Sequence, residues 1–245
     1  MLPYIGNKVK LNPFIIRNLP SNQTWNKFIE PFGGMFSTYY GLSRTDITAV
    51  YNDINPLNQN LFLCVKDPEF ADYISDIPSS SELYYEFQKG ISDNFEEPNF
   101  EMAMMWAYVL SGSLSQQQLL DGQWRSGGWE AFKIQITRRW FIQKMKDIHS
   151  IESLDYKDCI HKWDSTQSLF YIDPPYRNTE DYYLFHNYNE NSHYELSNIL
   201  KEINGKFCLS YYYFKDLEKW YPTSDFRWEW WTKTGRADEI LIMNY

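Results

Sequence analysis

The sequence has few cysteines and lacks any long apolar segment. Its three cysteines stand far apart and form no CxxC pair, which argues against a disulfide framework and a structural zinc site. The four histidines show no spacing typical of metal ligands, so we expect no metal. No apolar run approaches the roughly 18 residues of a membrane span, and residues 1–8 contain no apolar signal-peptide core. These absences predict a cytoplasmic protein that does not enter a membrane.

The chain is rich in aromatic side chains and acidic overall. It has 245 residues, of which 19% are aromatic, and its formal net charge is −9. An evenly acidic protein would bind nucleic acid poorly, because phosphate contacts need Lys and Arg. The charge is uneven, however: residues 1–27 contain no acid, and residues 122–146 contain Glu130 alone among six basic side chains. Charge alone leaves two alternatives open, a polarised binding face and chance clustering.

Short apolar runs that end in polar residues alternate with helical patterns. This alternation predicts βαβ units and a mostly parallel sheet with helices on both faces, an α/β fold of the Rossmann-like type. Such sheets bind ligands at the carboxyl ends of their strands. The predicted strands lie at 25–30, 49–51, 169–172, 206–211 and 239–243.

Residues 78–148 follow a different pattern. The segment 97–110 is too apolar all round for a surface helix, and Phe132, Ile136 and Trp140 share one helical face. We therefore predict a mainly helical insertion over 78–148, in an α/β body formed by residues 1–77 and 149–245.

Two glycines follow the first predicted strand. Gly33 and Gly34 lack a Cβ atom, so a ligand can approach the backbone closely. Asp53 ends the next strand, at about the spacing at which an acid accepts hydrogen bonds from ribose hydroxyls. Together these features favour a nucleoside ligand, although an isolated Gly-Gly pair is more often an ordinary turn.

The strongest local pattern is Asp173-Pro174-Pro175-Tyr176, directly after the strand 169–172. Two prolines force the chain to leave the sheet in a stiff conformation. The Asp173 carboxylate and the Pro174 carbonyl then become adjacent acceptors, which suit an amino group bearing two hydrogens. Tyr176 supplies a flat face for the ring that bears this group. The alternative is a rigid surface turn with an exposed Asp.

Five segments, in their order along the chain, resemble the DNA adenine-N6 methyltransferase family, in its D12 class. They are Tyr4-Ile5-Gly6-Asn7-Lys8 with Lys10-Leu11, Glu30-Pro31-Phe32 with Gly34, Asp53-Ile54-Asn55, Asp155-Tyr156, and Asp173 to Tyr176. The resemblance spans nearly the whole chain outside 78–148. It implies S-adenosylmethionine as methyl donor, double-stranded DNA as substrate and the insertion 78–148 as target-recognition region. A cognate restriction nuclease is one compatible partner, and the sequence leaves the oligomeric state open.

The resemblance also implies roles for individual residues. The expected catalytic residues are Asp173, Pro174, Pro175 and Tyr176. The expected cofactor-binding residues are Tyr4, Gly6, Asn7, Lys8, Glu30, Pro31, Phe32, Gly33, Gly34, Asp53, Ile54, Asp155, Tyr156 and Asp173. The basic, glycine-rich segment adds the expected DNA contacts Trp124, Arg125, Trp129, Lys133, Arg138 and Arg139, of which the two tryptophans fit core packing equally well.

The sequence departs from the family pattern at two points. Phe36 occupies the usual position of a second glycine, which puts cofactor affinity or loop geometry in question. The recognition region lacks the stretch typical of GATC-specific members, so this target is not expected.

The expected reaction is direct methyl transfer to the amino nitrogen of an adenine extruded from the duplex, without a covalent intermediate. Two alternatives remain open: an amino-group methyltransferase acting on RNA or a protein amide, and a relative that binds DNA or cofactor without catalysis.

Overall fold

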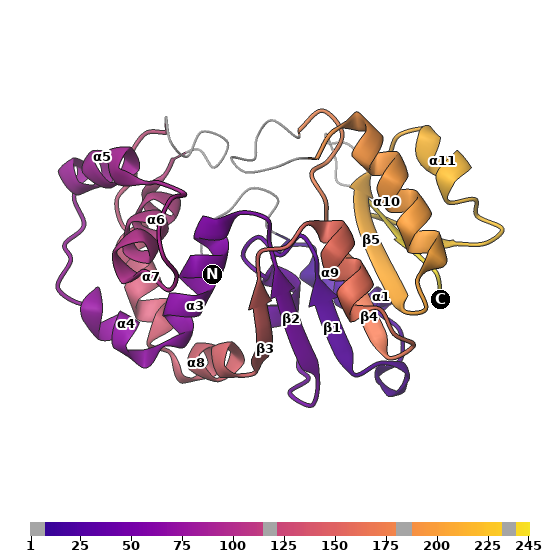
Figure 1. Cartoon of the computed structure of the whole chain (residues 1–245), viewed down its shortest axis with the longest axis horizontal. Coiled ribbons are helices and arrows are strands. Elements are labelled where there is room, and N and C mark those ends of the chain that lie inside the picture. The colour runs from indigo at the N-terminus through magenta and orange to yellow at the C-terminus, as the bar shows by residue number, and fades with distance from the viewer. Residues whose placement is uncertain (1–7, 115–121, 180–187, 232–238) are drawn as a thin grey trace.

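The computed structural model describes residues 8–114, 122–179, 188–231 and 239–245. Its sheet has the strand order β3-β2-β1-β4-β5-β7-β6 and carries helices on both faces (Figure 1). Neighbouring strands are parallel, except that β7 is antiparallel to both β5 and β6. The α/β sheet predicted from the sequence is confirmed. The strands are β1 (Lys27–Glu30), β2 (Thr48–Asn52), β3 (Ile148–Glu152), β4 (Ser168–Ile172), β5 (Lys206–Tyr212), β6 (Arg227–Trp231) and β7 (Glu239–Met243).

Alternate residues of each strand point to opposite faces of the sheet, so the sheet separates two apolar cores. Phe28 of β1 belongs to one core and Ile29 to the other. Helices α1 to α8 contribute to the first core, and α9, α10 and α11 cover the second. The helices are α1 (Asn12–Asn18), α2 (Ser37–Gly41), α3 (Pro56–Lys66), α4 (Pro68–Tyr73), α5 (Ser81–Gly90), α6 (Phe100–Gly112), α7 (Gly128–Ile136), α8 (Arg139–Lys146), α9 (Tyr156–Trp163), α10 (Glu190–Glu202) and α11 (Asp216–Trp220).

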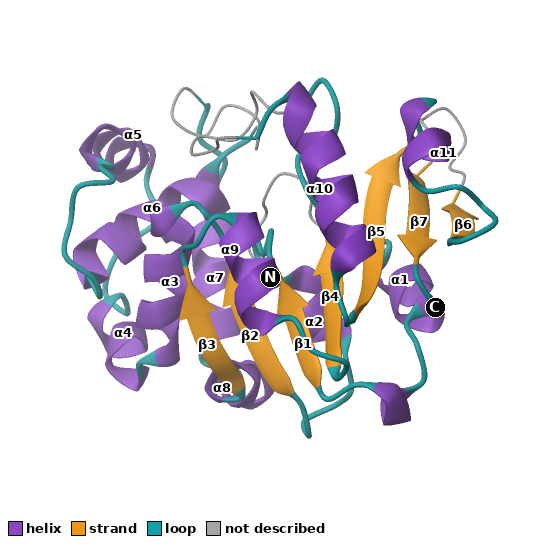
Figure 2. Cartoon of the chain, turned by 45° about the vertical axis from the view of Figure 1, so that its right-hand side comes forward, coloured by secondary structure: helices purple, strands orange, loops and turns teal. Residues whose placement is uncertain are grey.

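The strand order reverses beside β1, which pairs with β2 on one side and with β4 on the other. Ligands of open α/β sheets bind at such a reversal, outside the carboxyl ends of the strands. Figure 2 shows the parallel strands ending at one common edge, where β7 begins. We call this the carboxyl edge. The loop after Glu30, Asp53 and the turn after Ile172 all lie along it.

The segment predicted as an insertion is mainly helical where it is described, and it contains α5, α6, α7 and α8. It shares a core with the sheet, because α6 packs on α3. The Trp106 Nε1 group donates to Asn58 Oδ1 at 2.9 Å, and Asn60 exchanges hydrogen bonds with the backbone of Asn99. The domain boundaries at residues 78 and 148 stay a prediction.

Two helices of this segment, α6 and α8, lie toward opposite edges of the sheet. Helix α3 starts at the carboxyl end of β2, and α6 runs antiparallel to it, so α6 ends toward the carboxyl edge. Helix α8 leads directly into the start of β3, and its Lys144 donates to the carbonyl of Leu42, ahead of β2. Figures 1 and 2 accordingly show α8 at the edge where the parallel strands begin.

Candidate active site at the carboxyl edge

The turn of Asp173 to Tyr176 leaves β4 at the carboxyl edge, beside the reversal of strand order. The Asp173 Oδ1 atom lies 2.9 Å from the Nζ atom of Lys8, and both side chains are largely buried. Lys8 is held by its backbone N–H, which donates to Ser37 Oγ of α2 at 3.3 Å. The structure thus brings together two predicted site residues that are far apart in the sequence.

Sequence reasoning gave no role to Glu239 and Ser210, which complete this cluster. The Tyr176 hydroxyl donates to Glu239 Oε1 at 2.7 Å and lies 2.9 Å from Ser210 Oγ. Glu239 is also 3.5 Å from Lys8 Nζ. The sequence did contain one signal, since Glu239 is the only charged residue of an otherwise apolar strand.

The cluster perturbs the ionisation of its members. Burial raises the pKa of Asp173 to about 6, although Lys8 acts to lower it. Burial would lower the pKa of Lys8, but the charges of Asp173 and Glu239 outweigh this effect and raise it. Burial also raises the pKa of Glu30 well above its usual range, only partly offset by a hydrogen bond from the backbone of Tyr39. Strongly perturbed groups gathered at a strand edge are typical of functional sites.

The glycine loop is held in shape by its protein neighbours. A Cβ atom on Gly33 would lie 2.6 Å from the Tyr51 ring, and the Gly33 N–H donates to Asn52 O. The missing side chain of Gly33 thus allows close packing on β2, and its predicted contact with the cofactor stays a prediction. Gly34 has a positive φ of 48°, which favours glycine.

Phe36 adopts the left-handed backbone conformation, with φ of 53°, at the position where the family usually has glycine. Its ring is fully buried and stacks on Tyr39 with ring centroids 4.5 Å apart. It also packs edge-on against Tyr51. The ring therefore points into the core, and Phe36 adopts a left-handed backbone conformation that a glycine would adopt without strain.

Asp53 fastens the glycine loop to the end of β2. Its Oδ2 accepts from the Gly34 N–H at 2.7 Å, and its Oδ1 accepts from the Asn55 N–H at 2.9 Å. Burial raises its pKa, and these hydrogen bonds act against that shift. The Asn58 side chain also donates to this carboxylate, so about one of its four lone-pair positions is left for a further donor. Ile54 lies between Asp53 and Asn55, the residue that caps α3.

The other predicted cofactor residues that the structure describes also lie at this edge. The Phe32 and Tyr156 rings stack at 5.1 Å, and the Pro31 carbonyl accepts from Asn52 Nδ2. Asp155 caps α9 by accepting from the Lys157 N–H at 2.9 Å. Tyr4, Gly6 and Asn7 lie outside the described residues.

The structure does not bring the predicted DNA-contacting residues together on one surface. Trp129 is 1% exposed and donates its indole N–H to Ile77 O, so its side chain belongs to the core, and the predicted DNA contact is wrong for this conformation. Lys133 donates to the carbonyls of Ser75 and Ile77, which occupies its ammonium.

The remaining four divide between the two edges of the sheet. Arg138 and Arg139 are exposed but precede β3, at the edge opposite the turn of Asp173 to Tyr176. The backbone N–H of Arg125 donates to Gly112 O, and Trp124 pairs with Ser113, both at the end of α6 that faces the carboxyl edge. Only Trp124 and Arg125 therefore lie on the catalytic side.

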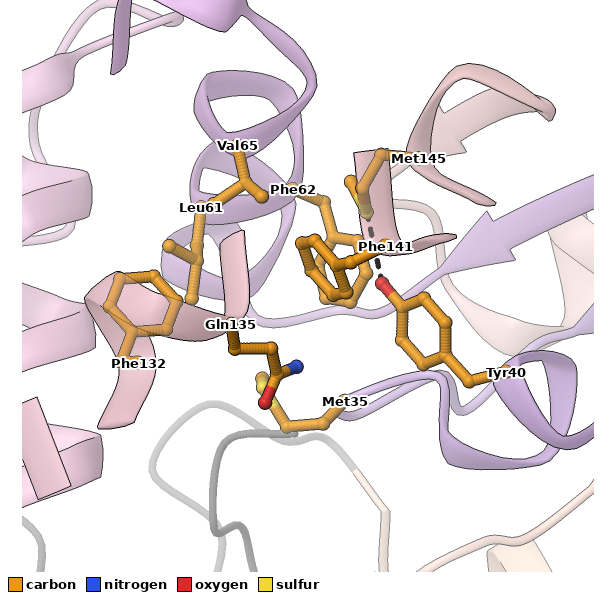
Figure 3. Close-up of a pocket in the computed structure, with 9 residues that line it drawn as sticks. All are labelled: Met35, Tyr40, Leu61, Phe62, Val65, Phe132, Gln135, Phe141 and Met145. Atoms are coloured by element: carbon orange, nitrogen blue, oxygen red, sulfur yellow. Dashed lines mark hydrogen bonds between the residues drawn. The ribbon is translucent and has the colours of Figure 1, made fainter. Parts of the chain in front are cut away.

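A small, largely apolar pocket of about 30 Å³ is separate from this site (Figure 3). Neither Asp173 nor Lys8 lines it. Its lining residues are Met35, Tyr40, Leu61, Phe62, Val65, Phe132, Gln135, Phe141 and Met145.

In the part of the chain that the structure describes, no helix is long and apolar enough to cross a membrane. The same residues contain no group of three or more His, Cys, Asp or Glu side chains that is arranged to hold a metal ion.

The comparison with known proteins identifies the family of the chain. No curated protein matches the chain in sequence. The model of one family, the D12 class N6 adenine-specific DNA methyltransferases, matches residues 4–235, which is nearly the whole chain and includes the glycine loop, Asp53 and the catalytic turn. The chain therefore belongs to the D12 class of N6 adenine-specific DNA methyltransferases.

Proposed function

We propose that this enzyme binds S-adenosylmethionine along the carboxyl edge and transfers its methyl group to the 6-amino nitrogen of an adenine extruded from duplex DNA. The observation that carries the proposal is the buried Asp173 carboxylate, which follows β4 beside the loop that Asp53 fastens to β2. Methyl donor and acceptor need to meet within a short distance, and this edge offers polar groups for both.

The residues at the edge fit the proposed cofactor. Asp53 keeps capacity to accept a hydrogen bond from a ribose hydroxyl, and the stacked Phe32 and Tyr156 rings offer an apolar wall for an adenine. Glu30, which lies near enough to Asp173 to feel its charge, provides a carboxylate for the positively charged methionine end. The cofactor supplies a methyl group bonded to a sulfonium, which is a strong electrophile.

In the proposed transfer, Asp173 and the Pro174 carbonyl accept the two amino hydrogens of adenine. This directs the nitrogen lone pair away from the ring and toward the methyl group, so the nitrogen–carbon bond forms as the carbon–sulfur bond breaks. Asp173 is placed to take the proton that the methylated nitrogen then releases. The contribution of the protein is mainly positioning and preorganised electrostatics.

Base extrusion is required because an amino group inside the duplex stack cannot reach a bound methyl donor. Extrusion of the base costs a few kcal/mol. We assign Tyr176 the role of stacking on the extruded ring. Tyr176 is 8% exposed, with Lys8 Nζ 4.7 Å from its ring centroid and Tyr212 packed edge-on against it. The incoming base therefore has to displace a neighbour of this ring.

Substitution of Asp173 tests the function. Asp173→Ala should abolish methyl transfer to duplex DNA while S-adenosylmethionine binding, measured by calorimetry, stays nearly unchanged. Asp158→Ala removes an exposed carboxylate on α9 and serves as the matched control with wild-type activity. Activity in Asp173→Ala would contradict the assignment of the acceptor.

The substrate is tested with labelled donor and duplex DNA, RNA and protein offered in parallel. Incorporation into DNA, with N6-methyladenine recovered after digestion, supports the proposal. Incorporation only into RNA or protein would overturn it, and no incorporation into any of them would favour a binding relative without catalysis.

A further inference from the structure

Glu239 joins the separate segments of the catalytic cluster, and the chemistry described so far gives it no task. It is the first residue of β7, which enters the sheet at the carboxyl edge because it is antiparallel to β5. Its Oε1 atom lies 2.7 Å from the Tyr176 hydroxyl, 3.2 Å from Ser210 Oγ and 3.5 Å from Lys8 Nζ. A single oxygen thus contacts the catalytic turn, β5 and the N-terminal segment.

We propose that Glu239 is a positioning residue for methyl transfer, which fixes the Tyr176 ring through its hydroxyl and the Asp173 carboxylate through Lys8. The inference rests on the proposed function, because it gives these two side chains the roles of stacking face and amino-group acceptor.

The geometry explains why a carboxylate is needed at this position. Lys8 carries its charge on a flexible four-carbon stem, so one partner alone defines its position poorly. Asp173 Oδ1 at 2.9 Å and Glu239 Oε1 at 3.5 Å hold the ammonium between two carboxylates. Lys8 in turn fixes the carboxylate of Asp173. The hydrogen bond to Glu239 tethers the far end of the Tyr176 ring, which sets the plane of its face.

Packing alone does not explain Glu239. The other residues of β7 are apolar and fully buried, and burying a carboxylate is costly unless it is paired. A hydrophobic side chain would complete the strand more simply. The side chain of Glu239 is 11% exposed, and its Oε1 atom contacts Tyr176, Ser210 and Lys8.

The charge of Glu239 also acts on Asp173. It raises the pKa of Asp173 alongside burial, whereas Lys8 lowers it. Removal of the Glu239 charge should therefore lower the pKa of Asp173 and move the acid limb of kcat/KM to lower pH, since this limb reports the free enzyme. The titratable and charged groups that face Asp173 are Lys8, Glu239, Tyr176, Tyr171 and Glu30.

The test compares Glu239→Leu, which removes charge and acceptor, with Glu239→Gln, which keeps an acceptor oxygen of the same shape. Glu239→Leu should lower kcat about 100-fold, the effect of a small misplacement of reacting groups, with an unchanged KM for S-adenosylmethionine. Glu239→Gln should lose less and should shift the acid limb to lower pH. Glu152→Gln removes a comparably buried carboxylate at the end of β3 and should keep the wild-type kcat and acid limb.

A double-mutant cycle separates positioning from a general loss of stability. Tyr176→Phe removes the hydroxyl that contacts Glu239, so Glu239→Gln should cost fewer-fold in kcat in this background than in the wild type. Independent, multiplicative losses together with an unmoved acid limb would overturn the inference. Because Glu239→Gln is isosteric, it decides the question even if Glu239→Leu fails to fold.

Failure of this inference differs from failure of the proposed function. A wild-type enzyme that methylates DNA adenine, with Glu239→Gln equal to it in kcat and in pH profile, overturns only the role of Glu239. A wild-type enzyme that transfers no methyl group to DNA overturns the function itself.

Discussion

The catalytic turn and the basic segment 122–146 were both predicted from short sequence patterns, but the fold preserves only the first as one site. The turn stays together because the carboxyl ends of parallel strands meet at one edge. That edge gathers Lys8, Asp173 and Glu239 from distant parts of the chain. The basic segment runs along α7 and α8, which span the molecule from near the carboxyl edge to the opposite edge.

The difference shows that a residue at the end of a parallel strand is stronger evidence for a site than a cluster of charged residues in the sequence. A residue that directly follows a parallel strand has its place in space determined by the sheet. A charged residue on a helix is placed by helical phase and length: the nine residues of α7 rise about 13 Å, which separates Arg125 from Arg138. The predictions below, from the largest expected effect to the smallest, test this contrast.

The largest effect is expected for Lys8→Met at the catalytic edge. Loss of the ammonium leaves the buried carboxylates of Asp173 and Glu239 without their common counter-charge, which typically costs about 3–5 kcal/mol. We expect kcat/KM to fall by at least about 100-fold.

The Lys8→Met substitution should also shift the pH profile of the enzyme in a defined direction. Lys8 lowers the pKa of Asp173, so its removal should carry that pKa above its present value of about 6. The fraction of ionised Asp173 at neutral pH then falls, and the acid limb moves to higher pH, opposite to the shift expected for Glu239→Gln. Lys10→Met, which removes an exposed lysine nearby, is the control. An acid limb that does not move would refute the coupling of Lys8 to Asp173.

In the helical segment, Trp129→Ala should damage stability and not DNA recognition. The indole is buried among Tyr108 and Phe132 and donates to Ile77 O. Truncation of such a ring costs about 3–5 kcal/mol of the free energy of unfolding. Denaturant titration measures this loss. DNA affinity per folded molecule should be unchanged. A clear loss of affinity in the folded fraction would show that Trp129 contacts DNA.

Much of the catalytic edge could be predicted from the sequence, because Asp173-Pro174-Pro175-Tyr176 and the glycine pair directly follow apolar strands. Glu239 was not predicted to act there, since only the antiparallel insertion of β7 between β5 and β6 brings its first residue to the carboxyl edge. The packing role of Gly33 was not predicted for a similar reason: its close neighbours are Tyr51 and Asn52, which become adjacent only when β1 pairs with β2.

A paired substitution tests which end of the basic segment meets DNA. Arg125→Ala, on the catalytic side, should weaken DNA binding by about 1–3 kcal/mol if the side chain contacts a guanine edge. Arg139→Ala removes an equally exposed arginine at the opposite edge and should change the affinity little. Binding of a duplex substrate at fixed salt, followed by fluorescence anisotropy, compares the two. A larger loss in Arg139→Ala would mean that DNA also contacts the edge where the parallel strands begin.

The smallest effect is expected for Lys133→Met. The Lys133 ammonium donates to the carbonyls of Ser75 and Ile77 at 3.2 and 3.0 Å, next to Glu130. Methionine keeps the apolar stem and removes these hydrogen bonds, so the free energy of unfolding should fall by about 1 kcal/mol. DNA affinity should follow the Arg139→Ala control, because this charge is already engaged within the protein. A reduced salt dependence of DNA binding in Lys133→Met would instead show that the ammonium leaves these carbonyls to neutralise a phosphate.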